Sequence, residues 1–169
     1  EWAENFDKLA YLLGNALEGI AVEIEHIGST AIPKLAAKPI IDIDIVYENA
    51  EMFEDIKKRL EKIGYYHNGN QGIEHREVFK RRKLILPHRI LDGIAHHLYV
   101  CIAGSDALNN HIVFRDFLRK NETARIEYQN LKYDIAKASN NNRKVYAAIK
   151  EEKASAFVNT IIKKARLEL

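Results

Sequence analysis

The chain has 169 residues, of which 47% are apolar and 30% charged, as is ordinary for a globular domain with a sizeable core. Its formal net charge of +2 is close to neutral and gives no electrostatic reason to expect a nucleic-acid partner. The single cysteine, Cys101, excludes an internal disulfide and lies in an apolar run, where we expect a small buried side chain and not a reactive thiol. No apolar run reaches membrane-spanning length, so we expect no membrane partner. Because a single cysteine is typical of a reducing compartment, we expect a cytoplasmic protein.

The first expected element is an amphipathic helix. Its apolar residues recur at helical spacing: Trp2, Phe6, Leu9, Leu12, Leu13 and Leu17. Residues 21–27 then predict a strand, and residues 30–35 a short helix with Ser29 near its N-cap. The turn between them suits a phosphate, because Gly28 lets an oxyanion approach the backbone and the hydroxyls of Ser29 and Thr30 add hydrogen bonds to those of a helix N-terminus. A plain helix cap is the competing interpretation of this turn taken alone.

A strand with two carboxylates follows at residues 40–47. Because a strand alternates its side chains between two faces, Asp42 and Asp44 share one face and the neighbouring isoleucines share the other. Adjacent carboxylates repel one another and lose solvation unless a cation lies between them, and Mg²⁺ takes oxygen ligands of this kind. Twelve residues separate Ser29 from Asp42, which leaves room for a turn, a short helix and a return into a neighbouring strand.

The middle of the chain predicts one more helix and two more strands. Residues 51–63 suit an amphipathic helix, and residues 65–70 a short extended piece and turn. Strands are expected at residues 74–83 and 96–103, joined by a basic loop over residues 82–93.

Only helices are expected after residue 104. They are predicted at residues 105–120, 121–139 and 143–165, with the run Asn140-Asn141-Asn142 between the last two. The pattern is an α/β core over residues 1–103 and a helical extension over residues 104–169. Since no Gly- or Pro-rich linker separates them, we expect the extension to pack on the core as one structural unit.

Several strings of residues carry a resemblance to a known family. They are HIGSTAIP at residues 26–33, LAAKPIIDID at 35–44, REVF at 76–79, HHLYV at 96–100 and FRDFL at 114–118. On these strings the chain resembles the GrpB-like family, and its Gly-Ser turn followed by Asp-hydrophobe-Asp resembles the signature of the polymerase-beta-like nucleotidyltransferase superfamily. The resemblance implies an α/β (α+β) fold, with a nucleotidyltransferase-like mixed β-sheet core flanked by helices and a C-terminal three-helix extension.

The resemblance also implies roles for individual residues. In the superfamily the Gly-Ser turn holds the triphosphate of a nucleotide, and the paired acids hold metal ions. Carried over to this chain, Gly28, Ser29 and Thr30 would contact a nucleoside triphosphate. Asp42 and Asp44 would bind Mg²⁺ or Mn²⁺ and take part in catalysis.

Two cations belong to the same strings and are candidates for phosphate contact. Lys38 precedes the acidic strand and Arg76 begins a strand expected near it. Arginine grips phosphate through two donors and lysine offers a point charge, so we expect both residues to contact the nucleotide. A solvated surface role is the competing interpretation for each.

The expected third carboxylate of the superfamily is missing from the strand over residues 96–103. His97 and Tyr99 share one face of that strand, and His96 points to the other, so one histidine alone can serve the site. We prefer His97 as metal ligand and catalytic residue. The site then uses one metal, or a His-plus-carboxylate set that favours Mn²⁺ or Zn²⁺, or it no longer catalyses. Glu77 would supply the missing acid if its side chain faced the same way.

Two classes of function follow. The first is an enzyme that transfers a nucleotidyl group, with the help of a metal ion, from a nucleoside triphosphate to an unknown acceptor. The alternative is a non-catalytic module with a degenerate active site that binds a nucleotide or a coenzyme A-related ligand, because GrpB-like domains also occur joined to dephospho-coenzyme A kinase. A small-molecule nucleotide is the expected partner in both.

Overall fold

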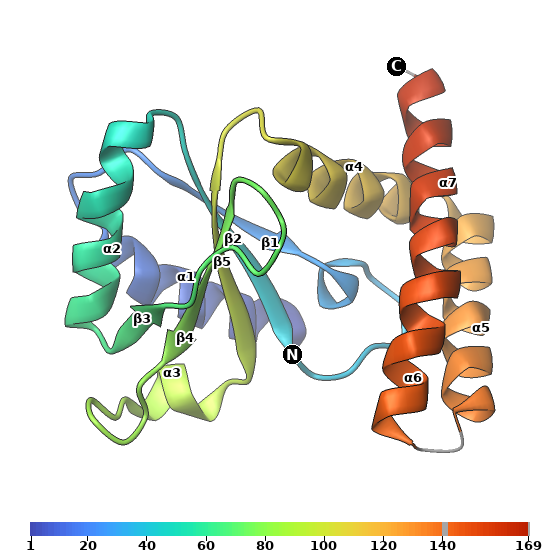
Figure 1. Cartoon of the computed structure of the whole chain (residues 1–169), viewed down its shortest axis with the longest axis horizontal. Coiled ribbons are helices and arrows are strands. Elements are labelled where there is room, and N and C mark those ends of the chain that lie inside the picture. The colour runs from blue at the N-terminus through green and yellow to red at the C-terminus, as the bar shows by residue number, and fades with distance from the viewer. Residues whose placement is uncertain (140–141, 169) are drawn as a thin grey trace. The chain divides into compact units, whose positions relative to one another are not determined.

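The structure, a computed structural model, describes residues 1–139 and 142–168 (Figure 1). Its internal contacts divide the chain into two compact units. The first, here called the sheet unit, comprises residues 1–31 and 37–111, and the second, the helical unit, comprises residues 32–36 and the chain from residue 112 onward. The expected packing of the extension on the core stays a prediction.

The sheet unit is built around five strands. They are β1 (Glu23–Ile27), β2 (Ile41–Tyr47), β3 (Tyr65–His67), β4 (Arg76–Arg81) and β5 (His96–Ile102), in the spatial order β1-β2-β5-β4-β3. β2 and β5 run parallel and the other neighbours run antiparallel, so the sheet is mixed. Two neighbouring interior strands, β2 and β5, carry the acidic pair and the histidine pair.

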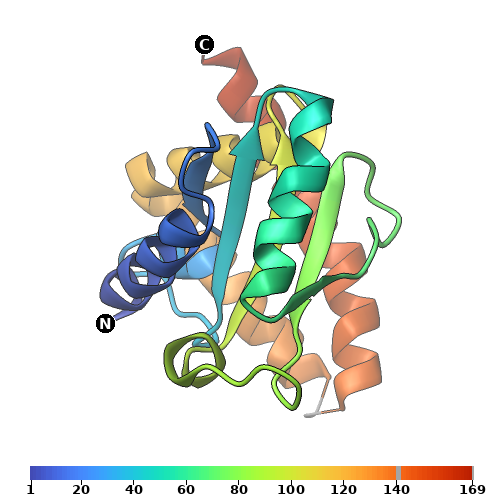
Figure 2. The ribbon, with the colours of Figure 1, turned by 90° about the vertical axis from the view of Figure 1, so that its left-hand side faces the viewer.

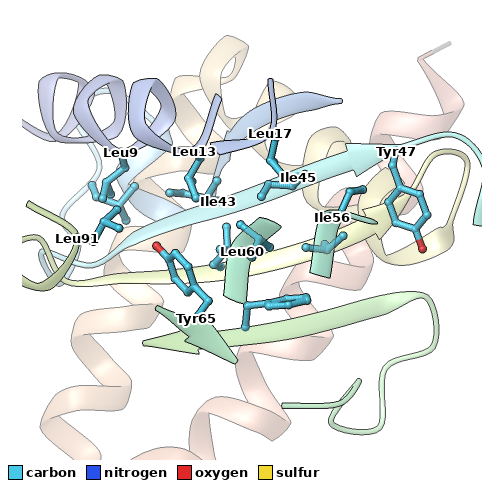
Figure 3. Packing of buried hydrophobic residues seen from close by; sticks show 14 residues of the cluster. Leu9, Leu13, Leu17, Ile43, Ile45, Tyr47, Ile56, Leu60, Tyr65 and Leu91 are labelled. Atoms are coloured by element: carbon cyan, nitrogen blue, oxygen red, sulfur yellow. The ribbon is translucent and has the colours of Figure 1, made fainter. Parts of the chain in front are cut away.

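Helices α1 (Trp2–Ala16) and α2 (Phe53–Lys62) lie over one face of this sheet (Figure 2). Their apolar stripes meet the isoleucines of β2, as the close view of the core shows (Figure 3). The buried side chains labelled there include Leu9, Leu13, Leu17, Ile43, Ile45, Ile56 and Leu60. Each side chain of this size stabilises the fold by about 1.5–3 kcal/mol when fully buried. The acidic side chains of β2 therefore point to the sheet face opposite this core.

The helices that follow the sheet are α4 (Asp106–Lys120), α5 (Glu122–Ala138), α6 (Arg143–Ile149) and α7 (Ser155–Leu167). A π-helical segment, η3 (Lys150–Ala154), joins α6 to α7 without a break, so the third predicted helix forms with one widened turn. Asn121 caps α5 and Asn142 caps α6 through their side-chain oxygens. Asn140 and Asn141 of the predicted break lie outside the described residues. The unit's core gathers apolar residues such as Leu35, Leu118, Tyr128 and Ile161.

Two local predictions were wrong. The helix expected at residues 30–35 is a single 3₁₀ turn, η1 (Ser29–Ala31), because Pro33 has no amide hydrogen to donate and Lys34 adopts a φ of 65°. The loop expected at residues 82–93 ends in a short helix, α3 (Arg89–Gly93), capped by Nδ1 of His88, which accepts from two backbone amides. No helix in the described ranges combines the length and the apolar character needed to cross a bilayer.

Candidate functional site

The register of β2 and β5 assembles the centre of the candidate site. Asp42 lies directly beside His97, and Asp44 lies directly beside Tyr99. Residues paired in a sheet point to the same face, so these four side chains share the face opposite the α1–α2 core; we call it the acid face. The alternation predicted for Asp42 and Asp44 is the one found, and the phase preferred for His97 is also found.

Each acid of the pair holds one imidazole. Nδ1 of His97 lies 2.8 Å from Oδ1 of Asp42, and Nδ1 of His111 lies 2.8 Å from Oδ2 of Asp44. A carboxylate only accepts, so both Nδ1 atoms donate and both Nε2 atoms remain available to a ligand. The side chain of Asp42 is 26% exposed, whereas that of Asp44 is wholly buried. The acid face therefore contains two carboxylate–imidazole pairs. The Asp42–His97 pair is partly exposed to solvent, and the carboxylate of the Asp44–His111 pair is buried.

His111 was missed by sequence reasoning. It lies in the second turn of α4, on the part of that helix that belongs to the sheet unit. Nothing in its local sequence distinguishes it from a surface histidine, because its proximity to Asp44 depends on how the chain turns after β5. Its ring also lies 6.1 Å from that of Tyr99, so α4 adds a second histidine to the acid face.

One oxygen of the buried acid has no donor. Within the described residues, Oδ1 of Asp44 is buried and forms no hydrogen bond. Burying a carboxylate oxygen without a hydrogen-bond partner is energetically costly, so the presence of such an atom needs an explanation. Binding of a cation against Oδ1 would explain it, because the cation would compensate the oxygen's charge. Burial, the nearby charge of Asp44 and a hydrogen bond to that carboxylate raise the pKa of the Cys101 thiol, so the thiol stays protonated as expected and is at most a weak donor to Asp44.

The Gly28 backbone lies against the other acid. A Cβ added to Gly28 would overlap Oδ2 of Asp42, and the φ of 73° at this position also disfavours any side chain. The glycine thus lets the turn approach the carboxylate, which brings the turn and the acids together as predicted.

The residues after Gly28 offer less to a phosphate than the sequence suggests. Because η1 is one 3₁₀ turn, it lacks the aligned peptide dipoles of a longer helix, and that part of the expectation was wrong. Thr30 is buried and its hydroxyl bonds to Nε2 of His26 at 2.9 Å. Ser29 and the turn's backbone amides are the remaining candidates for phosphate contact.

The two candidate cations are placed differently. Arg76 pairs in register with Cys101 and so points to the acid face, where its guanidinium lies 4.7 Å from the ring centre of Tyr99. Its Nε is buried without a partner among the described residues. Burial raises the pKa of Tyr99 to about 12, so its phenol stays protonated beside the acids. Lys38 lies exposed in the loop that leads into β2.

Two alternatives considered for the third ligand lie on the wrong face. Glu77 pairs with Val100, points to the α1–α2 side and bonds to His67 at 2.8 Å, so it does not supply the missing acid. His96 also points away from the acid face, where its Nε2 accepts from the hydroxyl of Tyr65 at 2.7 Å. Its Nδ1–H donates to the carbonyl of residue 94, and burial lowers the pKa of this histidine.

A third carboxylate does reach the acid face, from β1, a strand that was predicted but not considered as the source of this acid. Glu25 of β1 lies directly opposite Asp44 in the antiparallel pair, so both side chains point to the same face. Residues paired in this way have their Cβ atoms about 5 Å apart. The alternation of Glu23 and Glu25 along β1 shows in the sequence that both side chains share one face of the strand. Only the pairing of β1 with β2 shows that this face is the acid face.

The described residues contain no ready-made metal cage. Across residues 1–139 and 142–168, no group of three or more His, Cys, Asp or Glu side chains is arranged to hold a metal ion. A closed protein cage is therefore not present in the described part of the chain. Mg²⁺ bound together with nucleotide phosphates needs only one or two carboxylates, and Asp42 and Asp44, which share the acid face, supply that number.

Comparisons with known sequences agree on one family. The GrpB protein family matches residues 1–164. The chain is 33% identical over 164 residues to the glutamate-rich protein GrpB of Alkalihalophilus pseudofirmus, covering 94% of this chain and 89% of that protein. It is 33% identical over 136 residues to UPF0157 protein YqkA of Bacillus subtilis, covering 80% of this chain but 37% of that longer relative. A match at 24% identity covers 89% of this chain and 41% of a dephospho-CoA kinase of Mycolicibacterium paratuberculosis.

Solved structures show the fold. The crystal structure of conserved protein GrpB from Enterococcus faecalis aligns with a TM-score of 0.76 at 30% identity, covering 97% of this chain and 92% of that chain. The Cid1 poly(U) polymerase aligns with a TM-score of 0.52 at 14% identity, covering 79% of this chain and 40% of that chain, which is a likeness in fold alone. The predicted nucleotidyltransferase-like mixed sheet is confirmed. The chain belongs to the GrpB family.

Proposed function

We propose that the acid face binds a nucleoside triphosphate together with Mg²⁺ or Mn²⁺, and that it transfers the nucleotidyl group to a small acceptor. The observation that carries this proposal is the buried, unpartnered Oδ1 of Asp44 beside the in-phase carboxylate of Asp42. These two acids would hold the cation through one or two oxygens, and the phosphates would complete its coordination. When bound, the cation would neutralise phosphate charge and polarise the α-phosphate.

The remaining residues of the face have separate tasks in this proposal. The Gly28 turn lies against Asp42, so its amides and the Ser29 hydroxyl would contact the phosphates next to the cation. Arg76, already held over Tyr99 and with an unpartnered Nε, would add a charged donor. Lys38, in the exposed loop before β2, would reach the outer phosphates.

The transfer step needs a base, and we assign that role to His97. Its Nδ1 is bonded to Asp42, which orients the ring and leaves Nε2 to take the proton of the acceptor's hydroxyl. The acceptor oxygen would then form a bond to the α-phosphorus, the bond to the bridging oxygen would break, and pyrophosphate would leave with that electron pair. His97 is more than half exposed, so an acceptor can reach it.

A non-catalytic binding module is the second candidate function. It is favoured by the two imidazoles, because the histidines occupy one oxygen of each acid and no third carboxylate stands on β5. The similarity to part of a dephospho-CoA kinase makes a coenzyme A-related nucleotide a ligand to test. Similarity in fold to a poly(U) polymerase makes a uridine nucleotide another.

Pyrophosphate release separates the two functions. The chain is incubated with each nucleoside triphosphate and a mixture of small acceptors, with Mg²⁺, with Mn²⁺ or with EDTA. Metal-dependent release that disappears in Asp42→Asn and Asp44→Asn supports the enzyme. Metal-dependent binding without release supports the module. Asp55→Asn, an exposed acid of α2, is the control for loss of one negative charge and should behave as the wild type.

A further inference from the structure

A pocket lies where strands β4 and β5 part. The hydrogen-bonded ladder between them ends at Phe79 and Leu98, and the chain segments beyond that pair enclose a cavity of about 460 Å³. Pockets of this volume are typical of small-molecule sites. All residues that line it belong to the sheet unit.

The walls of the pocket are largely aromatic and aliphatic. Tyr65, Phe79, Leu91, Ile94 and Tyr99 contribute apolar surface. The buried polar groups among the lining residues already have partners: the Tyr65 hydroxyl bonds to Nε2 of His96, Nδ1 of His96 bonds to the carbonyl of residue 94, and Arg81 bonds to Asp92. The interior thus offers apolar contact with few unsatisfied polar atoms, which suits the flat or apolar body of a ligand.

The charge around the pocket has one sign. Three cationic side chains line it, and no aspartate or glutamate does. Arg81 is bound to Asp92 at 2.8 Å, so its charge is compensated. Lys80 and Lys83 are exposed and form no ion pair within the described ranges. Two exposed ammonium groups at an apolar pocket attract the anionic end of a ligand.

The pocket also adjoins the acid face. His97 and Tyr99 line it and belong to that face as well, and His97 is bonded to Asp42. We propose that this pocket binds a small molecule with an aromatic or apolar body and a carboxylate or phosphate end. The identification of that molecule as the acceptor rests on the proposed function, whereas the binding site itself does not.

The test uses phenyl phosphate and benzoate as probes, with phenol as the neutral control. Each is titrated into the ¹⁵N-labelled chain without nucleotide or divalent cation. The two anions should shift the backbone amide signals of Lys80, Lys83 and Tyr99, and phenol should bind at least fivefold more weakly. A Lys80→Ala/Lys83→Ala double variant should lose at least fivefold in affinity for the anions. Lys57→Ala/Lys58→Ala, which removes two lysines of α2 outside the pocket, should keep wild-type affinity.

Failure of the pocket proposal can be distinguished from failure of the proposed function, because probe binding and nucleotide binding depend on different residues. Asp44→Asn should leave probe binding intact while nucleotide binding falls, and the lysine double variant should do the reverse. If the probes shift other regions of the chain, or if both lysine double variants bind them equally well, the pocket proposal is overturned whatever the nucleotide experiments show. If the probes bind as expected but no nucleotide does, the pocket stands and the acceptor assignment falls.

Discussion

The carboxylate of Asp42 occupies the space that a Cβ on Gly28 would need. This contact joins the turn that follows β1 to the second residue of β2, and the two strands pair antiparallel in the sheet. Glycine is therefore needed at this position for two reasons: the backbone has a positive φ, and the backbone lies close to a carboxylate.

Gly28→Ala should destabilise the chain more than a positive φ alone accounts for. A non-glycine residue in the left-handed region costs about 1–2 kcal/mol, and the overlap with Asp42 should add to that. Gly19→Ala is the matched control, because Gly19 has a φ of 85° but no atom within 4 Å of its missing Cβ. Urea unfolding of the two variants measures the difference. Equal losses of stability would show that the contact with Asp42 costs nothing.

His111→Ala should cost more stability than His97→Ala. Removing His111 takes away the imidazole that donates to Oδ2 of the wholly buried Asp44, and such a loss costs about 1–3 kcal/mol. Removing His97 exposes Asp42 further to water, which replaces the donor, so we expect a loss of about 1 kcal/mol or less. Chemical unfolding compares the two variants directly, and the reverse order would contradict the burial argument.

Asp44→Asn should leave the chain at least as stable as the wild type. The amide removes a buried negative charge whose Oδ1 has no donor, and it relieves repulsion from Asp42 and Glu25 on the same face. The residue's bond to His111 can persist through the amide oxygen. The free energy of unfolding measures this. A loss of more than about 2 kcal/mol would show that the charged couple stabilises the fold.

Lowering the pH should weaken the ion pair between Arg81 and Asp92, which holds the segment after β4. The hydrogen bond from Arg81 lowers the pKa of Asp92 from 3.8 to about 2. A carboxyl group with a lowered pKa contributes stability above its unfolded value, and that stability is lost as the pH falls through the interval between the two values. Between about pH 4 and 2 the free energy of unfolding should therefore fall less in Asp92→Asn than in the wild type. Unfolding at several pH values measures this difference. Asp55→Asn should keep the wild-type profile.

Much of the acid face follows from the alternation of side chains along two strands. The order of apolar and acidic residues in β2 places Asp42 and Asp44 together, and the same alternation separates His97 from His96. These predictions needed only that the segments be strands. The roles of these residues in binding and catalysis stay predictions.

The remaining members of the face depend on relations between elements. Glu77 could be excluded only from the register of β4 against β5, and Glu25 could be included only from the pairing of β1 with β2. His111 depends on the rotation of α4 about its axis, which local sequence does not determine.

The most direct test of the central claim is the affinity for nucleotide with and without a divalent cation. ATP, GTP, CTP and UTP are each titrated by calorimetry into the wild type, Asp42→Asn, Asp44→Asn and Asp55→Asn, in Mg²⁺, in Mn²⁺ and in EDTA. We predict that at least one nucleotide binds tenfold or more tightly with metal than with EDTA. That ratio should fall toward one in both site variants and persist in Asp55→Asn. Equal affinity in metal and in EDTA, or an unchanged ratio in Asp42→Asn and Asp44→Asn, would contradict the proposal that this face binds a nucleotide with its cation.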